Sequence, residues 1–137
     1  MKNYIYKGTE LTNIKKINLI TGKNSIAKDN FIDSLKKEKN TTVIAGFEKG
    51  LHYTEYNETW HRLYKSVIMF DFTLFVTTHS KEVVESFIRI SEATQAYNQF
   101  RFFELFKHHA TGQLLANSNN DGQLEYKVTH NSPFRGE

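Results

Sequence analysis

The sequence predicts an α/β domain with a short, mostly parallel sheet and a β-hairpin towards the C-terminus. Its 137 residues are enough for one domain with a real hydrophobic core, but not for two. Apolar, β-branched runs alternate with segments in which apolar residues have helical spacing. That alternation is typical of parallel strands joined by crossover helices.

Three apolar segments predict the strands of the parallel sheet. They are residues 17–21, 41–46 and 72–78. In the first, Ile17, Leu19 and Thr21 face one side and Ile20 the other, as expected for a strand that is buried on both faces.

Three further segments predict helices, each with an apolar face at helical spacing. They are residues 28–38, 53–68 and 81–93. In the second helix the apolar face is aromatic, with Tyr56, Trp60 and Tyr64. Such a face usually packs onto a sheet, and the alternative is that it stacks on bases or on a protein partner.

The predicted hairpin consists of residues 99–106 and 113–117, with Gly112 in the turn. Residues 117–122, which read NSNNDG, are typical of a loop. We expect one last short helix over residues 121–130.

The composition excludes several classes of protein. The absence of cysteine excludes disulfides, thiolate metal sites and thiol catalysis. A net charge of +3 gives only weak support for nucleic-acid binding. The longest apolar run, VIMF at residues 67–70, is too short for a signal peptide or a membrane span. We therefore expect a soluble cytoplasmic protein without a membrane partner.

The stretch NLITGKNSIAKDN has the spacing of a phosphate-binding loop. Gly22 follows a predicted strand, Lys28 comes six residues later, and a predicted helix follows, as in G-x-x-x-x-G-K-[ST]. Ala27 stands at the second glycine position and Asp29 at the position of the magnesium-binding hydroxyl. The candidate nucleotide-binding residues here are Gly22, Lys23, Asn24, Ser25, Ala27, Lys28 and Asp29. Taken alone, this stretch is better explained by an ordinary strand–turn–helix unit.

Two later segments match motifs of ATPases. VIAGFEKGLHY at residues 43–53 resembles the strand and loop hhhIDExExGLHx of ABC-type and OLD-like ATPases, with Glu48 at the second acidic position. TLFVTTHSKEVVESF at residues 73–87 resembles the segment of the same family in which a histidine at a strand end reaches the γ-phosphate. The resemblance gives that role to His79.

The three motifs occur in the family's order, and the C-terminal residues resemble its terminal hairpin, helix and "RG". The chain thus resembles small prokaryotic ABC-type or OLD-like AAA ATPases, relatives of the SMC and RecF proteins, over most of residues 3–137. The resemblance implies a minimal P-loop NTPase-like core of three layers. It also implies that the histidine strand lies between the other two parallel strands.

The chain departs from this family where catalysis occurs. The metal-binding aspartate falls on Ala45 and the water-activating glutamate on Gly46, so no catalytic residue is expected. Ser25 and Ala27 replace glycines, which would cost about 1 kcal/mol each if the loop required φ > 0 there. Asp29 brings negative charge to the phosphate position, and we expect it to cap its own helix.

A deletion removes the parts that complete the family's site. Only 16 positions separate Lys28 from Ile44, the interval that holds the family's helical lobe, glutamine loop and signature sequence. Residues 1–137 are therefore expected to form a single truncated domain, and head-to-tail dimerisation could not build the usual composite ATP site.

The sequence therefore predicts a pseudo-ATPase that does not hydrolyse nucleotides and acts as an interaction or regulatory module. The alternative is a weak ATP- or GTP-binding protein with residual activity, accessory to DNA repair or phage defence. No cofactor is expected to be required, and ATP with Mg²⁺ is expected to bind at most weakly. The expected partner is a protein of unknown identity or a second copy that buries apolar surface left by the deletion. His108 and His109 are adjacent on a predicted strand and are not expected to bind metal together.

Overall fold

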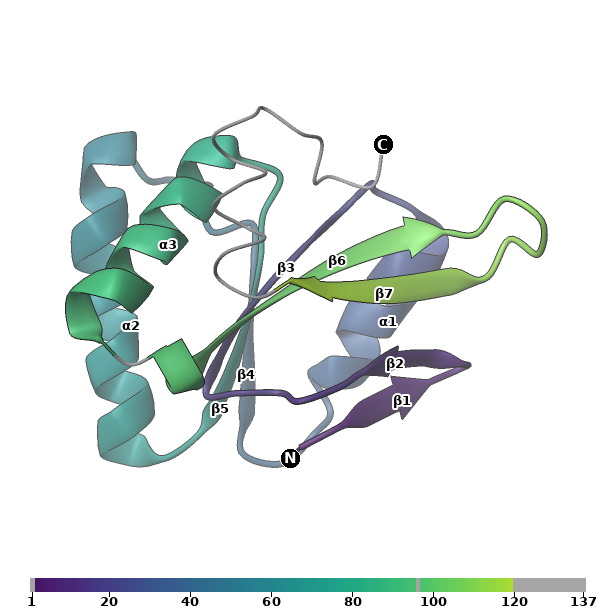
Figure 1. Cartoon of the computed structure of the whole chain (residues 1–137), viewed down its shortest axis with the longest axis horizontal. Coiled ribbons are helices and arrows are strands. Elements are labelled where there is room, and N and C mark those ends of the chain that lie inside the picture. Colours follow the sequence, from purple (N-terminus) through teal and green to yellow (C-terminus); the bar gives the residue numbers. More distant parts are fainter. Residues whose placement is uncertain (1, 96, 120–137) are drawn as a thin grey trace.

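The computed structural model describes residues 2–95 and 97–119 and shows a mixed α/β fold (Figure 1). Its main sheet has five strands in the order β4-β5-β3-β6-β7. In that order they are Thr41–Ala45, Thr73–Thr77, Ile17–Gly22, Phe100–Lys107 and Leu114–Asn119. The first four are parallel, and β7 is antiparallel to β6. The predicted fold class is confirmed.

The order of the strands confirms that the histidine strand β5 lies between the other two predicted parallel strands. In β5, Val76 is opposite Leu19 of β3 on one side and opposite Ile44 of β4 on the other. Right-handed crossovers through helices allow this order. The carboxyl ends of β3, β4 and β5 consequently lie along one edge of the sheet.

Three helices cover the two faces of the sheet and make the domain three-layered (Figure 1). Helix α1 (Ile26–Leu35) covers one face, while α2 (Tyr56–Phe70) and α3 (Lys81–Thr94) cover the other. The first helix was predicted over 28–38, but it begins at Ile26 and ends at Leu35. The lysine-rich residues after it form a turn instead.

The two faces of β3 lie in separate hydrophobic cores, as its sequence predicts. Ile17 and Leu19 pack with α2 and α3, whereas Ile20 packs with α1. At the centre of the first core, the Trp60 ring stacks on Phe47 with ring centroids 4.4 Å apart. The Trp60 indole donates a 2.8 Å hydrogen bond to Ser86 Oγ, which satisfies its buried N–H. The aromatic face of α2 therefore packs into the domain.

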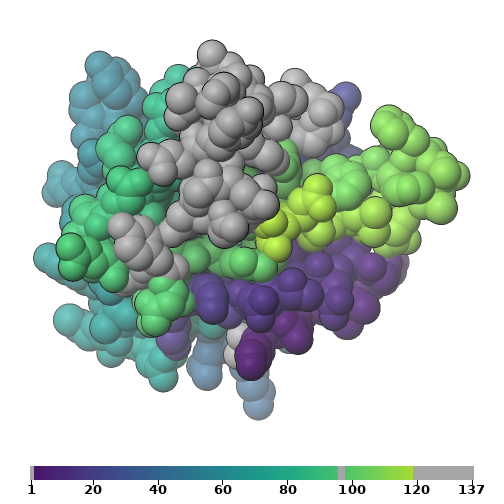
Figure 2. Space-filling model, viewed as in Figure 1, coloured from purple at the N-terminus to yellow at the C-terminus, as the bar shows by residue number. Residues whose placement is uncertain are grey.

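An N-terminal hairpin, which the sequence analysis did not predict, completes the layer that contains α1. It consists of β1 (Tyr4–Tyr6) and β2 (Thr9–Leu11), joined by Lys7 and Gly8 at φ 48° and 83°. Thr9 Oγ1 donates a 2.7 Å hydrogen bond to the Leu114 carbonyl, so this hairpin lies against the C-terminal one. Figure 2 shows the purple and yellow-green hairpins in contact.

The C-terminal hairpin confirms the predicted pairing of two strands. Its turn contains Gly112 at φ 71°, a conformation that favours glycine. The helix predicted over 121–130 lies outside the described residues. Within the described part of the chain, no helix is both long and apolar enough to cross a membrane.

Candidate functional site

The predicted site residues gather at the carboxyl edge, the end of the sheet where β3, β4 and β5 finish. Gly22, Ala45 and Thr77 are the last residues of those strands. The backbone N–H of Gly46 donates to the Thr77 carbonyl at 3.1 Å, and that of Thr78 donates to the Ile20 carbonyl at 3.2 Å. In open α/β sheets, ligands usually bind in the crevice beyond the carboxyl ends of the strands.

Gly22 is required by the close approach of a neighbouring strand. A Cβ atom at this position would lie 2.6 Å from the Leu105 carbonyl oxygen of β6. No side chain fits against a backbone atom at that distance. The glycine of the phosphate-loop pattern therefore has a structural role in this chain, independent of any ligand.

Ser25, rather than Asp29, caps helix α1. Ser25 has extended backbone angles, and its side chain accepts a 3.1 Å hydrogen bond from the Lys28 N–H. The expectation that Asp29 caps its own helix is wrong, because the helix begins three residues before it. Asp29 instead lies exposed in the first turn of α1. There its negative charge interacts favourably with the positive end of the helix dipole.

The loop before α1 does not need glycine at the positions of Ser25 and Ala27. The described non-glycine residues with positive φ are Lys7, Asn13, Asn40, Asp71 and Gln95, none of which lies in this loop. The expected cost at Ser25 and Ala27 is therefore absent. Ala27 is already inside α1, because the chain passes from β3 to the helix through Lys23, Asn24 and Ser25 alone.

Lys28 is buried, and the chain's own backbone binds its ammonium group. Only 4% of its surface is exposed, and Nζ donates a 2.8 Å hydrogen bond to the Gly22 carbonyl. Burial lowers the pKa of Lys28 from its ordinary value, while the negative charges of Asp29 and Glu48 partly oppose that shift. The lysine stays beside the loop, but one of its donors is already used.

Glu48 joins the loop after β4 to the end of β5. Its carboxylate accepts a 2.6 Å hydrogen bond from Thr78 Oγ1 and a 3.3 Å hydrogen bond from the His79 N–H. The His79 ring in turn lies with Nε2 2.8 Å from Asn24 Oδ1. Asn24, Glu48 and His79 are thus brought together from three different loops, and Lys28 lies near them in the first turn of α1.

The two positions where the resemblance would place acids carry no ionisable group. Ala45 is the last residue of β4. Gly46 follows with a φ of 74° and begins a turn. The Lys49 N–H closes this turn by donating a 3.0 Å hydrogen bond to the Gly46 carbonyl. His52, which matches the family's GLH motif, caps the short helix Tyr53–Glu55 through its side chain. It therefore has a local structural role.

Sequence reasoning missed two polar residues near this edge. Thr78 is fully buried and donates to Glu48, although it was noted only as part of a motif match. Glu104 on β6 is opposite Thr21 of β3 and has an exposed fraction of 7%. An acidic residue inside the apolar run FFELF was the available signal for Glu104.

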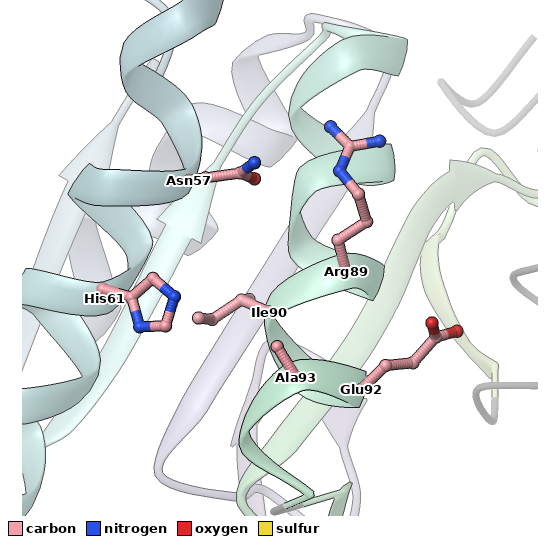
Figure 3. Close-up of a pocket in the computed structure, with 6 residues that line it drawn as sticks. All are labelled: Asn57, His61, Arg89, Ile90, Glu92 and Ala93. Atoms are coloured by element: carbon pink, nitrogen blue, oxygen red, sulfur yellow. The ribbon is translucent and has the colours of Figure 1, made fainter.

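A groove between α2 and α3 is a separate feature of the surface. Its lining residues are Asn57, His61, Arg89, Ile90, Glu92 and Ala93 (Figure 3). In Figure 3, Asn57 and His61 reach from α2 towards α3, whereas Glu92 points away from α2.

No arrangement of metal ligands is found in the part of the chain that the structure describes. No three His, Asp or Glu side chains there are grouped so that they could hold an ion. His108 and His109 lie in the loop after β6, not on the strand where they were expected.

Comparisons of this chain with protein-family models, with curated proteins and with solved structures find no match. The described residues define the chain as a mixed α/β domain with a polar cluster at the carboxyl edge of its sheet. Its relation to ABC-type and OLD-like ATPases stays a prediction that rests on the three sequence motifs.

Proposed function

We propose that this chain is a degenerate relative of ABC-type and OLD-like ATPases that does not hydrolyse nucleotides and acts as an interaction or regulatory module. The observation that carries the proposal is the chemistry at the end of β4. Ala45 and Gly46 offer no carboxylate for a metal ion or for an attacking water, and phosphoryl transfer depends on such groups.

Glu48 does not replace the missing acids. It lies beyond the catalytic positions, in the turn after β4, and its two oxygens already accept hydrogen bonds from Thr78 and His79. A base for hydrolysis must reach the attacking water, and this carboxylate is directed into the protein's own donors.

Hydrolysis is tested by a phosphate-release assay with ATP or GTP and Mg²⁺. We expect the rate to equal that of buffer alone. Turnover near the common enzyme value of about 10 s⁻¹ that disappears in Lys28→Ala would overturn the proposal.

Weak nucleotide binding without hydrolysis is the second candidate. It is favoured by the convergence of Lys28, Asn24 and His79 beside the N-terminus of α1. Titration calorimetry with ATP, ADP and GTP, with and without Mg²⁺, separates this candidate from an interaction module that binds no nucleotide.

The interaction surface that we propose is the amino edge, formed by the segments that precede β3, β4 and β5. The Thr73 N–H donates to the Asn40 carbonyl and the Leu74 N–H to the Lys16 carbonyl, each at 2.8 Å, so the three segments adjoin. The C-terminal end of α2 lies at this edge, at the bottom of Figure 1, and its last three residues carry exposed apolar side chains. They are Ile68, Met69 and Phe70, with exposed fractions of 51%, 74% and 71%.

The exposed lysines of the segment before β4 favour an acidic protein as the partner, and the exposed Asp71 after Phe70 is already paired with Lys16. The segment that precedes β4 reads KKEKN, and its lysines 36, 37 and 39 are all exposed. An apolar centre with a charged rim is the usual anatomy of a protein interface. Two copies that met through this edge would bring like charges together, which disfavours a homodimer here.

A further inference from the structure

We propose that the Glu48 carboxylate is a built-in anion that fills a phosphoryl-binding position at the carboxyl edge. A phosphate-containing ligand would have to displace it. The inference deepens the proposed function and rests on it, because it concerns regulation of the same site.

The donors around Glu48 are those that would bind a phosphoryl oxygen. The Thr78 hydroxyl lies 2.6 Å from one carboxylate oxygen, and the His79 N–H lies 3.3 Å from the other. Both donors come from consecutive residues at the end of β5. A hydroxyl and a backbone N–H directed at one anion suit a phosphate as well as a carboxylate.

Lys28 brings a positive charge near Glu48. Burial lowers the pKa of Lys28, and the negative charges of Asp29 and Glu48 both act to raise it. The hydrogen bond from Nζ to the Gly22 carbonyl fixes the position of this positive charge. The attraction between these charges favours the ionised form of Lys28.

The turn after β4 is built to hold Glu48 in this position. The N–H groups of Gly46 and Phe47 donate to the Thr77 carbonyl at 3.1 and 3.0 Å, which ties the turn to β5. Phe47 is buried against Trp60 and Tyr56 in the core. With its neighbour anchored there, Glu48 is directed to the end of β5.

A carboxylate in this position excludes other anions. A phosphoryl group would compete for the donors of Thr78 and His79, and it would lie beside the negative charge of Glu48 if both remained. Replacing Glu48 with glutamine removes the charge and keeps nearly the same volume. The amide is a weaker competitor for the donors, so the position becomes available.

The test compares Glu48→Gln with the matched control Glu38→Gln, which removes the same charge from an exposed residue. Pyrophosphate and ATP without Mg²⁺ are titrated into each variant by calorimetry. We expect Glu48→Gln to bind pyrophosphate at least tenfold more tightly than the wild type, and Glu38→Gln to bind it as the wild type does. Equal affinities of the two variants would overturn the inference.

If circular dichroism shows that Glu48→Gln is unfolded, a measurement on the wild type tests whether pyrophosphate displaces Glu48. Pyrophosphate at tens of millimolar is expected to shift the backbone amide resonance of His79, because the anion takes the place of Glu48. No shift of that resonance would contradict the inference.

The two proposals fail separately. Phosphate release by the wild type would overturn the absence of hydrolysis without bearing on Glu48. Unchanged pyrophosphate affinity in Glu48→Gln would overturn the role of Glu48 and leave the absence of hydrolysis intact.

Discussion

The side chains at the two edges of the sheet differ in their surroundings. At the carboxyl edge charged side chains are bound by the protein's own groups, and at the amino edge apolar side chains are exposed to solvent. At the carboxyl edge, Lys28 is bound by the Gly22 carbonyl, and Glu48 is bound by Thr78 and His79. At the amino edge, Met69 and Phe70 are about three-quarters exposed, at 74% and 71%. At the edge where the sequence motifs predict a ligand, Lys28 and Glu48 already bind groups of the protein itself. At the edge without a motif, the apolar side chains are exposed and available to a partner.

This contrast shows that a motif and an available site are different things. Gly22 and Lys28 have the spacing of a phosphate-binding loop, and both residues have a structural role in this fold. Glycine allows β6 to approach closely, and the lysine holds the end of β3. Residues that match a ligand-binding pattern can therefore be required by packing and by the chain's own hydrogen bonds.

The largest effect on this comparison is expected from Gly22→Ala. The new methyl group would lie 2.6 Å from the Leu105 carbonyl oxygen, so strand β6 must shift. We expect the free energy of unfolding to fall by about 3 kcal/mol, measured by urea denaturation. The control is Gly50→Ala, where no atom lies within 4 Å of the added Cβ and only the φ of 78° opposes it.

The control is expected to lose about 1 kcal/mol, from backbone strain alone. Equal losses in the two variants would show that the contact between β3 and β6 is not what requires glycine at position 22.

A smaller effect is expected from Lys28→Met. At pH 7 the lost hydrogen bond to Gly22 and the relief of a buried charge oppose each other, so stability should change by about 1 kcal/mol or less. The pH dependence is more informative. Because burial lowers the pKa of Lys28 in the folded protein, the unfolded protein binds more protons between that pKa and the ordinary value of 10.5.

The stability of the wild type relative to Lys28→Met should therefore rise as the pH increases towards 10.5. Chemical denaturation between pH 8 and pH 10.5 measures this difference, with the exposed Lys37→Met as the control. A relative stability that stays constant or falls with pH would show that burial does not lower the pKa of Lys28.

The smallest effect on stability is expected from Phe70→Ser at the amino edge. The ring is 71% exposed, so its loss should change the free energy of unfolding by less than about 0.5 kcal/mol. Light scattering should show a monomer for both proteins. A wild-type dimer that Phe70→Ser dissociates would identify a second copy, rather than an acidic partner, as the occupant of this edge.

Much of the fold could be predicted because its signals are local. The apolar runs of β3, β4 and β5 and the helical spacing of Val83, Val84 and Phe87 are periodic patterns that secondary structure imposes directly. The N-terminal hairpin was missed because its strands have three residues each, too few for a clear period. The start of α1 was misplaced because the motif drew the helix boundary to Lys28, while the cap at Ser25 set it earlier.

The sequence by itself determined the α/β class, the main strands and helices, and the absence of acids at Ala45 and Gly46. Only the tertiary structure decided that Lys28 binds the Gly22 carbonyl and that Glu48 reaches Thr78 and His79. Glu48 and Thr78 are 30 residues apart, and no local pattern encodes their contact. It depends on the register of β4 against β5 and on the burial of Phe47, since packing across the sheet fixes where the turn after β4 directs its side chains.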